Sequence, residues 1–335
     1  MKIVFILFVF ITLVFGEKTV TIASYNVENL FDLHRSGYEY YEYIPNGVSN
    51  WNAKNYKIKL KNLSRVIIDI DADIIALQEI ESLRALKDLR KTLKQNGLYY
   101  KYYKIADRKN TTIKVAILSK IPFTATREIS VQSSLKYRNI LETKFSIDNN
   151  DFYIFTNHWK SKGGPESMRI VSAKALLKRI KQIGYDKNII LLGDFNSDYE
   201  EYIKFKRKRR HNDTNGKTGI NHVLKTIKQT TRSSDVKYEK NNFYNLWYDI
   251  DKKNRYTYIY RGKKETLDNI IISQSLLNKS GMYYKENSLN TLNKDYLFRG
   301  NKINRWYTSG RKPRKHKGKG YSDHLPLIAT FVIAN

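Results

Sequence analysis

The sequence predicts an α/β protein that folds as a single domain, and three observations support this. Short apolar runs alternate along the chain with segments of helical periodicity, which is the pattern of α/β folds. The chain has 335 residues, of which 41% are hydrophobic, enough to fill a sizeable core. It contains no repeat of fixed period and no Gly/Ser linker. We therefore expect one domain over residues 17–335.

Three segments have the spacing of helices that bury one face. In the first, the apolar residues step by three and four: Leu60, Leu63, Ile67 and Ile70. A second helix is expected to begin at Pro165, because proline is favoured in the first turn. Its predicted buried residues are Ile170, Ala173, Leu177 and Ile180. A third helix is expected over residues 81–94, and the aromatic stretch 37–51 is expected to be an irregular loop.

The first sixteen residues have the features of an export signal. Lys2 precedes an apolar run from Ile3 to Phe15, and Gly16 suits cleavage by signal peptidase. The run is short for a membrane anchor, and a first core strand or an uncleaved anchor is the alternative. We therefore expect residues 1–16 to be a signal peptide and the protein to be periplasmic or secreted. The chain has no cysteine, so it folds without disulfides and cannot bind zinc through thiolates.

The chain is strongly basic, with 61 Lys and Arg against 32 Asp and Glu and a formal net charge of +29. A field of this sign concentrates polyanions such as nucleic acid, anionic membrane or lipopolysaccharide. One basic cluster spans residues 204–210 and another spans residues 311–319. A solvated charge run is the plainer interpretation of each. The second cluster, however, runs straight into Asp323-His324 and the apolar stretch "LPLIATFVI", so we expect it to lie on a loop within the fold.

Polar side chains follow several predicted strands at their C-terminal ends. The runs "TIASYN", "DIIALQE", "FYIFTNH" and "NIILLGDFN" end at Asn26, Glu79, His158, and Asp194 with Asn196. Asp268 in "TLDNIIIS" and the pair Asp323-His324 join this set. Any one of them could simply cap a turn or a helix. Together, at the sheet edge where ligands gather in α/β proteins, they predict a functional site.

The residue types in this set restrict its chemistry. Neither G-x-S-x-G nor G-x-x-x-x-G-K-[ST] occurs in the chain, so neither a serine hydrolase nor a P-loop enzyme is expected. Oxygen ligands from Glu79, Asn26 and Asp323 suit a hard cation, Mg²⁺ or Mn²⁺, better than zinc. Such a cation with carboxylates and imidazoles around an anionic substrate indicates metal-assisted phosphoester hydrolysis.

The ordered motifs of the chain resemble those of the endonuclease/exonuclease/phosphatase superfamily, which includes deoxyribonuclease I and the abasic-site endonucleases. They are "SYNVENL", "ADIIALQEIE", "TNHWKSKGG", "LLGDFNSD", "LDNIIIS" and "YSDHLPL". The resemblance runs from about Thr19 to Thr330. It implies a four-layer α/β/β/α sandwich, in which two packed, mainly antiparallel or mixed sheets are flanked by helices. It also implies Mg²⁺ as cofactor, with Mn²⁺ as a substitute and Ca²⁺ as a supporting or structural ion.

The resemblance further implies roles for residues on the metal and nucleophile side of the site. Glu79 matches the metal-binding glutamate, and Asn26 and Asp323 match its companions near the metal. His158 matches the first active-site histidine. Asp194 matches the aspartate that orients or deprotonates the attacking water.

Other positions match residues that contact the phosphate. Asn196 matches the amide that holds the nucleophile and a phosphate oxygen. Asp268 matches the aspartate that orients the second histidine, His324, whose charged form would face the negative charge on the phosphoryl oxygens. Arg138, in "YRNILETKF", matches a phosphate-contacting arginine.

The chain departs from the family pattern at two places. Many nucleases carry an acid or a tyrosine before the apolar run of "TTIKVAILSK", where this chain has Ile113 and Lys114. His158 therefore has no obvious carboxylate partner. The second departure is a basic insertion at about residues 201–235, after the G-D-F-N motif.

These observations predict an exported, metal-dependent nuclease of low sequence specificity that acts on DNA or RNA, as a monomer without a stable membrane anchor. Each Lys or Arg that displaces a counterion strengthens binding to a polyphosphate. We expect such contacts from Arg138, Lys206, Arg207, Lys208, Arg209, Arg210, Lys312, Arg314, Lys315 and Lys317. Two alternatives stay open. One is a diesterase of the same superfamily acting on sphingomyelin or inositol phosphates, with the tyrosines of residues 38–43 docking on a membrane. The other is a non-catalytic nucleic-acid-binding protein.

Overall fold

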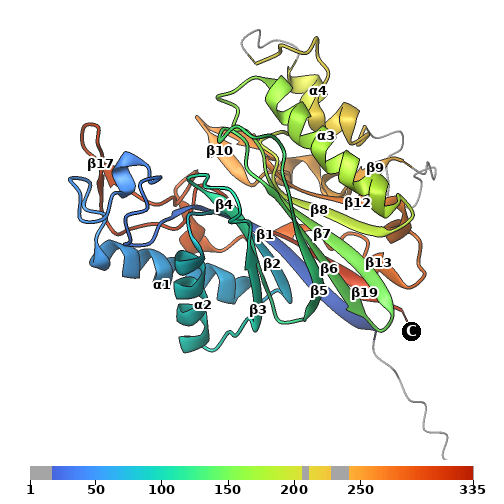
Figure 1. The fold of residues 1–335 in the computed structure, drawn as a ribbon, viewed down its shortest axis with the longest axis horizontal. Helices are drawn as coiled ribbons and strands as arrows, with labels where there is room; N and C mark the ends of the chain where they lie inside the picture. Colours follow the sequence, from blue (N-terminus) through green and yellow to red (C-terminus); the bar gives the residue numbers. More distant parts are fainter. Residues whose placement is uncertain (1–16, 206–210, 228–240, 335) are drawn as a thin grey trace, which may run out of the picture.

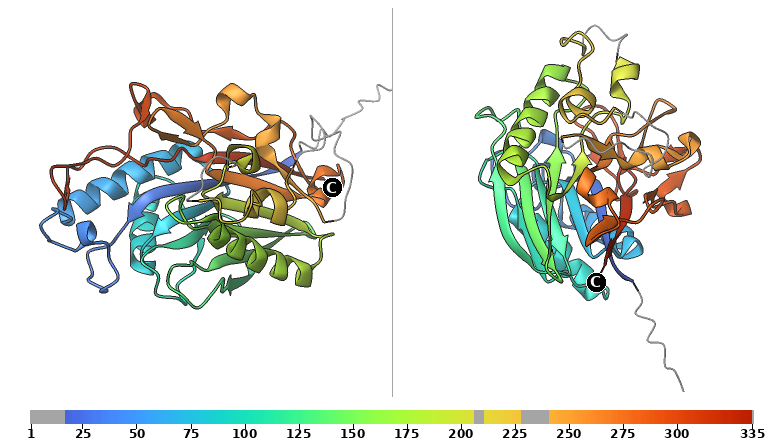
Figure 2. Two further views of the ribbon diagram at one scale, coloured as in Figure 1. Left: turned by 90° about the horizontal axis from the view of Figure 1, so that it is seen from above. Right: turned by 90° about the vertical axis from the view of Figure 1, so that its right-hand side faces the viewer.

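The computed structural model, which describes residues 17–205, 211–227 and 241–334, has the predicted α/β class and four-layer architecture (Figure 1). Two large sheets pack face to face, and helices cover their outer faces (Figure 2). The predicted signal peptide, residues 1–16, lies outside the described residues, as do Lys206, Arg207, Lys208, Arg209 and Arg210.

The first sheet has the strand order β13-β19-β1-β2-β4-β3, with β14 also paired to β19. Its central strands β1 and β2 are parallel, and the other pairs are antiparallel. The strands are β1 (Lys18–Leu30), β2 (Ile74–Ile80), β3 (Tyr102–Ile105), β4 (Lys114–Ser119), β13 (Met282–Tyr284), β14 (Asn290–Thr291) and β19 (Leu327–Ile333).

The second sheet has the order β5-β6-β7-β8-β12-β9, and its central strands β7 and β8 are parallel. The strands are β5 (Phe123–Ile129), β6 (Ile140–Ile147), β7 (Asn150–His158), β8 (Asn188–Asp194), β9 (Phe243–Asn245) and β12 (Asp268–Ser273). Each sheet thus contains one parallel pair, whose strands end at the same edge.

Alternation along the central strands explains why both sheets are covered on two faces. Ile22 in β1 and Ile190 in β8 pack in the core between the sheets. Tyr25 in β1 points to the opposite face and packs with α1 and α2, while Ile189 in β8 packs with α3. Because successive side chains of a strand point to opposite faces, an uninterrupted apolar run requires apolar partners on both sides.

The helices lie close to their predicted positions, but the buried face of one of them differs from the prediction at two residues. They are α1 (Ala53–Ile70), α2 (Leu83–Gln95), α3 (Glu166–Ile183) and the short α4 (Glu201–Lys204). Leu60, Leu63, Ile67 and Ile70 of α1 are buried as predicted.

The prediction for α3 was wrong at two positions. Ile170 and Leu177 are only half-buried, and Leu176 is buried with the correctly predicted Ala173 and Ile180. Pro165 precedes the helix as its N-cap. The buried stripe is rotated because it continues through a fully buried ion pair, Glu166–Arg169, with 2.6 Å between Oε2 and Nε, which hydropathy does not reveal.

Among the described residues, three two-stranded hairpins lie outside the two large sheets. They are β10–β11 (Tyr258–Tyr260, Lys263–Glu265), β15–β16 (Phe298–Arg299, Lys302–Ile303) and β17–β18 (Thr308–Ser309, Lys315–His316). The β17–β18 hairpin carries the basic cluster 311–319, and it lies beside the loop of residues 37–51 (Figure 1). The cluster therefore lies on a loop within the fold, as predicted. No helix among the residues described here is long and apolar enough to cross a bilayer.

Candidate active site

The predicted site residues come together where the parallel strand pairs of both sheets end. In the second sheet His158, Asp194 and Asp268 lie side by side, because His158 is in register with Asp194 and Asp194 with Asp268. In the first sheet Asn26 ends the regular part of β1 next to Glu79 on β2. The constellation thus draws its groups from both sheets.

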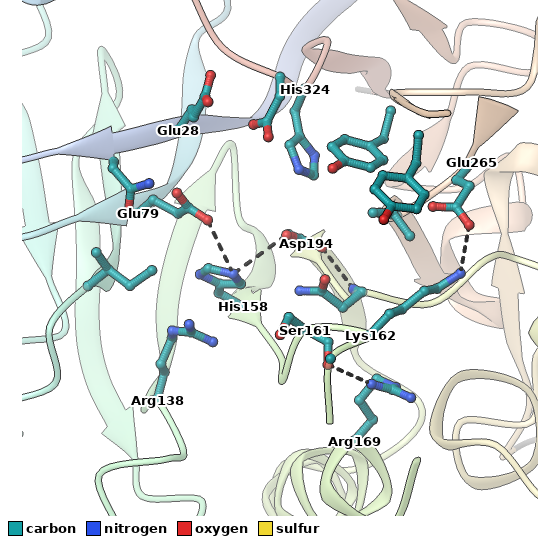
Figure 3. Close-up of a pocket in the computed structure, with 18 of the residues that line it drawn as sticks. Glu28, Glu79, Arg138, His158, Ser161, Lys162, Arg169, Asp194, Glu265 and His324 are labelled. Atoms are coloured by element: carbon teal, nitrogen blue, oxygen red, sulfur yellow. Dashed lines mark hydrogen bonds and ion pairs between the residues drawn. The ribbon is translucent and has the colours of Figure 1, made fainter. Parts of the chain in front are cut away.

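Glu79 is turned into the site by an irregularity in β2. The pairing of β2 with both β1 and β4 passes over this residue, so it is the extra residue of a bulge. Its φ of 68° is in the left-handed region, which costs a non-glycine residue of order 1–3 kcal/mol and recurs at functional sites. The bulge breaks the alternation of side chains, and the carboxylate points at His158 (Figure 3).

Asn26 joins the two halves of the site. Its Nδ2 donates to Glu79 Oε1 at 3.3 Å and to Asp194 Oδ2 at 3.1 Å. His158 Nε2 lies 3.5 Å from the same Asp194 oxygen and 3.8 Å from Glu79 Oε1. Carboxylates from β8 and β2 thus lie near His158 Nε2, whereas its buried Nδ1 has no hydrogen-bond partner among the described residues.

Asp268 and His324 form a buried pair. His324 Nδ1 lies 2.7 Å from Asp268 Oδ2, and Thr257 Oγ1 donates to the same oxygen at 2.6 Å. The Ser322 hydroxyl accepts from the His324 backbone N–H and donates to the Asn26 carbonyl, which fixes the loop against β1. The predicted partnership of Asp268 with His324 is thus formed.

The two histidines have opposite charge preferences. Burial opposes a charge on His324, but the carboxylates of Asp268, Asp194 and Asp323 outweigh it and raise the pKa of His324 well above its ordinary value. Burial, with the nearby charges of Arg138 and His324, lowers the pKa of His158 well below its ordinary value. The site therefore presents one imidazolium and one neutral imidazole at neutral pH.

Asp194 is poised to exchange a proton. Burial, opposed by His324 and reinforced by Asp268, raises its pKa to about 7. Its Oδ1 accepts from the Asn196 backbone N–H at 2.8 Å. A carboxylate with a pKa near the working pH is suited to take a proton from water.

Asn196 lies next to this carboxylate, and it shares a backbone acceptor with Arg138. Asn196 Nδ2 and Arg138 Nη1 each donate to the Trp159 carbonyl, at 3.1 Å in both cases. Both side chains line the same cavity as the histidines. Arg138 lies at the cavity wall facing His158 (Figure 3), and its contact with phosphate stays a prediction.

These groups line a cavity of about 660 Å³, here called the active-site cavity. One end holds the constellation. At the other end Lys162 Nζ is held by Asp198, Glu201 and Glu265 at 2.8, 3.0 and 3.5 Å. Those charges compensate one another, so among the described lining residues Arg138 is the cation least neutralised by carboxylates.

The family of the chain follows from its sequence and fold together. Residues 21–333 match the model of the Endonuclease/Exonuclease/phosphatase family. The chain belongs to this family. No curated protein sequence matches it.

Solved structures share this fold at low sequence identity. An endonuclease/exonuclease/phosphatase family protein from Bacteroides thetaiotaomicron is 16% identical, with a TM-score of 0.58 over 96% of this chain and 100% of that one. D. rerio TDP2 in complex with a single-strand DNA product is 14% identical, with a TM-score of 0.58 over 94% and 99%. A mannosyl-6-phosphatase of Bacteroides thetaiotaomicron is 17% identical, with a TM-score of 0.57 over 94% and 100%.

Members of this family are phosphate and phosphodiester hydrolases that generally use divalent metal ions. In the described part of this chain, no three His, Cys, Asp or Glu side chains are grouped as a complete metal cage. Mg²⁺ does not require one, since it is commonly held by one or two carboxylates and completed by water and substrate phosphate. Burial and the neighbouring charge of Asp323 raise the pKa of Glu79, and a cation between the two would relieve that repulsion. Glu79 and Asp323 therefore fit a hard cation, whereas Asn26 faces Glu79 with its amide Nδ2 and its Oδ1 accepts from the Glu28 backbone N–H.

Sequence reasoning missed a second charged group at the mouth of the cavity. Arg305 donates to the Glu28 carboxylate, and its Nη2 lies 3.1 Å from Asp323 Oδ2. Behind them the fully buried Lys59 donates to the carbonyls of Glu28 and Tyr321, at 2.9 Å each. Glu28 lies inside the "SYNVENL" motif, but nothing in the sequence pairs it with an arginine that comes 277 residues later.

Proposed function

We propose that the chain is an exported, metal-dependent nuclease that hydrolyses phosphodiester bonds of DNA with low sequence specificity, with RNA as a second candidate substrate. The observation that carries this proposal is the arrangement of Asp194, His158 and the Asp268–His324 pair around one cavity. The net charge of +29 favours a polyanionic substrate over a neutral-headgroup lipid. The proposal of export is based on the sequence of residues 1–16. We also propose that the protein is a monomer.

In this proposal each residue has one task. Asp194 accepts the proton of the attacking water, which Asn196 holds in place. His324, kept charged by Asp268, stabilises the negative charge that builds on the phosphoryl oxygens. His158 and Arg138 position the phosphate from the other wall. A divalent cation held by Glu79 and Asp323 would supply Lewis-acid stabilisation of the phosphate.

A substrate panel tests the proposal. Metal-dependent nicking of plasmid DNA and cleavage of RNA would be measured beside hydrolysis of sphingomyelin, inositol phosphates and a simple phosphomonoester, with His324→Ala as the inactive control. Nicking that the control lacks supports the nuclease. Turnover confined to the lipid, inositol or monoester substrates would refute the nuclease proposal and indicate another phosphoesterase. DNA binding without any hydrolysis would refute it too and indicate a non-catalytic binding protein.

The contribution of the basic hairpin is tested by salt dependence. The substitutions Lys312→Gln, Arg314→Gln, Lys315→Gln and Lys317→Gln together should lower the salt slope of duplex DNA binding by ~0.9 per lost contact. Affinity should fall similarly for unrelated sequences, because phosphate contacts do not read bases. Lys181→Gln with Lys279→Gln, two exposed lysines outside both basic clusters, is the control, and the change in slope is compared per charge removed. An equal change per charge in the two variants would make the hairpin a solvated charge run.

A further inference from the structure

A second cavity adjoins the active-site cavity at the wall that contains Arg305. This cavity, here called the side groove, has a volume of about 420 Å³, which is within the range of ~300–1,000 Å³ typical of small-ligand sites. Glu28, Asn29, Tyr40 and Arg305 line both cavities. A ligand that leaves the catalytic centre past Arg305 therefore enters the side groove directly.

The side groove combines aromatic surface with exposed cations. Lys312 and Arg314, from the β17–β18 hairpin, are exposed at its border, while Trp306 and His316 are buried at its floor. The Tyr40 side chain on its wall is 38% exposed. Glu42 adds an acceptor suited to the exocyclic amino group of a base. Basic side chains beside an accessible aromatic face are what single-stranded nucleic-acid sites use.

The groove is built in advance of any ligand. His316 Nδ1 accepts from Trp306 Nε1 at 2.8 Å, and His316 Nε2 lies 2.8 Å from the Glu42 carbonyl. These contacts tie the hairpin to the loop that carries Tyr40. The Tyr40 ring itself packs on Phe31, with 5.5 Å between centroids. A preformed groove loses less conformational freedom when a ligand binds.

We propose that the side groove is a nucleotide subsite, which stacks an unpaired base on Tyr40 and holds the next phosphate with Lys312 and Arg314. This inference rests on the proposed nuclease function and adds a preference for single strands, because moving a base out of the helix stack costs least when the base is unpaired.

The test compares two neighbouring tyrosines. Tyr41, which is 59% exposed and lines neither cavity, is the matched control for Tyr40. Cleavage would be measured on a mixed-sequence oligodeoxynucleotide, on the same strand annealed to its complement, and on bis(p-nitrophenyl) phosphate. The wild type should prefer the single strand. Tyr40→Leu should lose about ten- to hundredfold on it and less on the small diester, for which only the hydroxyl beside Arg138 is lost, while Tyr41→Leu should match the wild type.

Two further measurements keep failure of the groove distinct from failure of the nuclease proposal. Binding of the labelled single strand would be followed by fluorescence anisotropy in a Glu79→Gln background, where selective weakening by Tyr40→Leu supports the groove even if no nucleic acid is cleaved. Lys312→Gln with Arg314→Gln should lower the salt slope by ~0.7 per lost contact on single strands. Equal behaviour of the two tyrosine variants in binding, or a wild type that prefers the duplex, would overturn the inference.

Discussion

The buried pair Asp268–His324 gives the sharpest prediction for catalysis. Asp268→Asn keeps the shape of the side chain and an oxygen that can accept from His324 Nδ1, but it removes the negative charge 2.7 Å away. At that separation two unit charges attract by about 6 kcal/mol if the effective dielectric constant is ~20. Without this attraction, burial lowers the pKa of His324, and the imidazole is neutral at pH 7.

The loss of the imidazolium sets the size of the effect. Removing one donor that stabilises charge in the transition state lowers kcat by ~10²–10³. Asp268→Asn and His324→Ala should each show such a loss with bis(p-nitrophenyl) phosphate at saturating Mg²⁺. The double variant should lose no more than the worse single one, because both changes remove the same positive charge.

Thr257→Val is the control for this pair. It removes the 2.6 Å hydrogen bond to the same Asp268 oxygen and leaves the charge in place, so kcat should fall by about tenfold or less. Thermal unfolding of all the variants would confirm that they are folded. If the losses of Asp268→Asn and His324→Ala multiplied in the double variant, the two residues would be acting separately and the reasoning would be wrong.

Three further predictions concern the metal, the backbone and acid stability. Glu79→Gln should abolish most turnover and weaken Mg²⁺ binding in calorimetry without changing circular dichroism, and full activity in excess chelator would contradict metal dependence. Gly193→Ala should cost about 3 kcal/mol or more in urea unfolding, because φ is +129° and the new Cβ would lie 2.1 Å from the Asn157 carbonyl oxygen; a cost below about 1 kcal/mol would refute this. Burial lowers the pKa of His316, so its contribution to stability is complete above the ordinary value of about 6.5 and is lost as pH falls below it. His316→Asn should flatten the fall of Tm between pH 7 and pH 5, and parallel curves would contradict this.

The helices and strands whose apolar residues recur with a regular spacing could be predicted from the sequence. Uninterrupted apolar strands and the three-and-four spacing of α1 specify buried elements directly, and convergence of strand ends brought Asn26, His158 and Asp194 together. The buried pair Glu166–Arg169 was not predictable in this way, because charged residues normally indicate an exposed face.

The contacts of loops were also beyond sequence reasoning. The partnership of Arg305 with Glu28 depends on how a late hairpin folds back on β1. The bulge that turns Glu79 into the cavity has no residue signature, since glutamate is not favoured at positive φ. The motif order indicated which residues form the site, whereas tertiary packing decided how they meet.

Because the site is divided between two sheets, its activity depends on how the two sheets are positioned relative to each other. Asn26 and Glu79 belong to one sheet and His158, Asp194 and Asp268 to the other, and the 3.1 Å contact from Asn26 to Asp194 crosses the seam. A slip of about 1 Å between reacting groups can cost ~10²-fold in rate. A small loss of packing in the apolar core between the sheets, far from any substrate, should therefore abolish catalytic activity while the hydrogen bonds within each sheet remain. On gentle heating, activity should disappear before the strands melt.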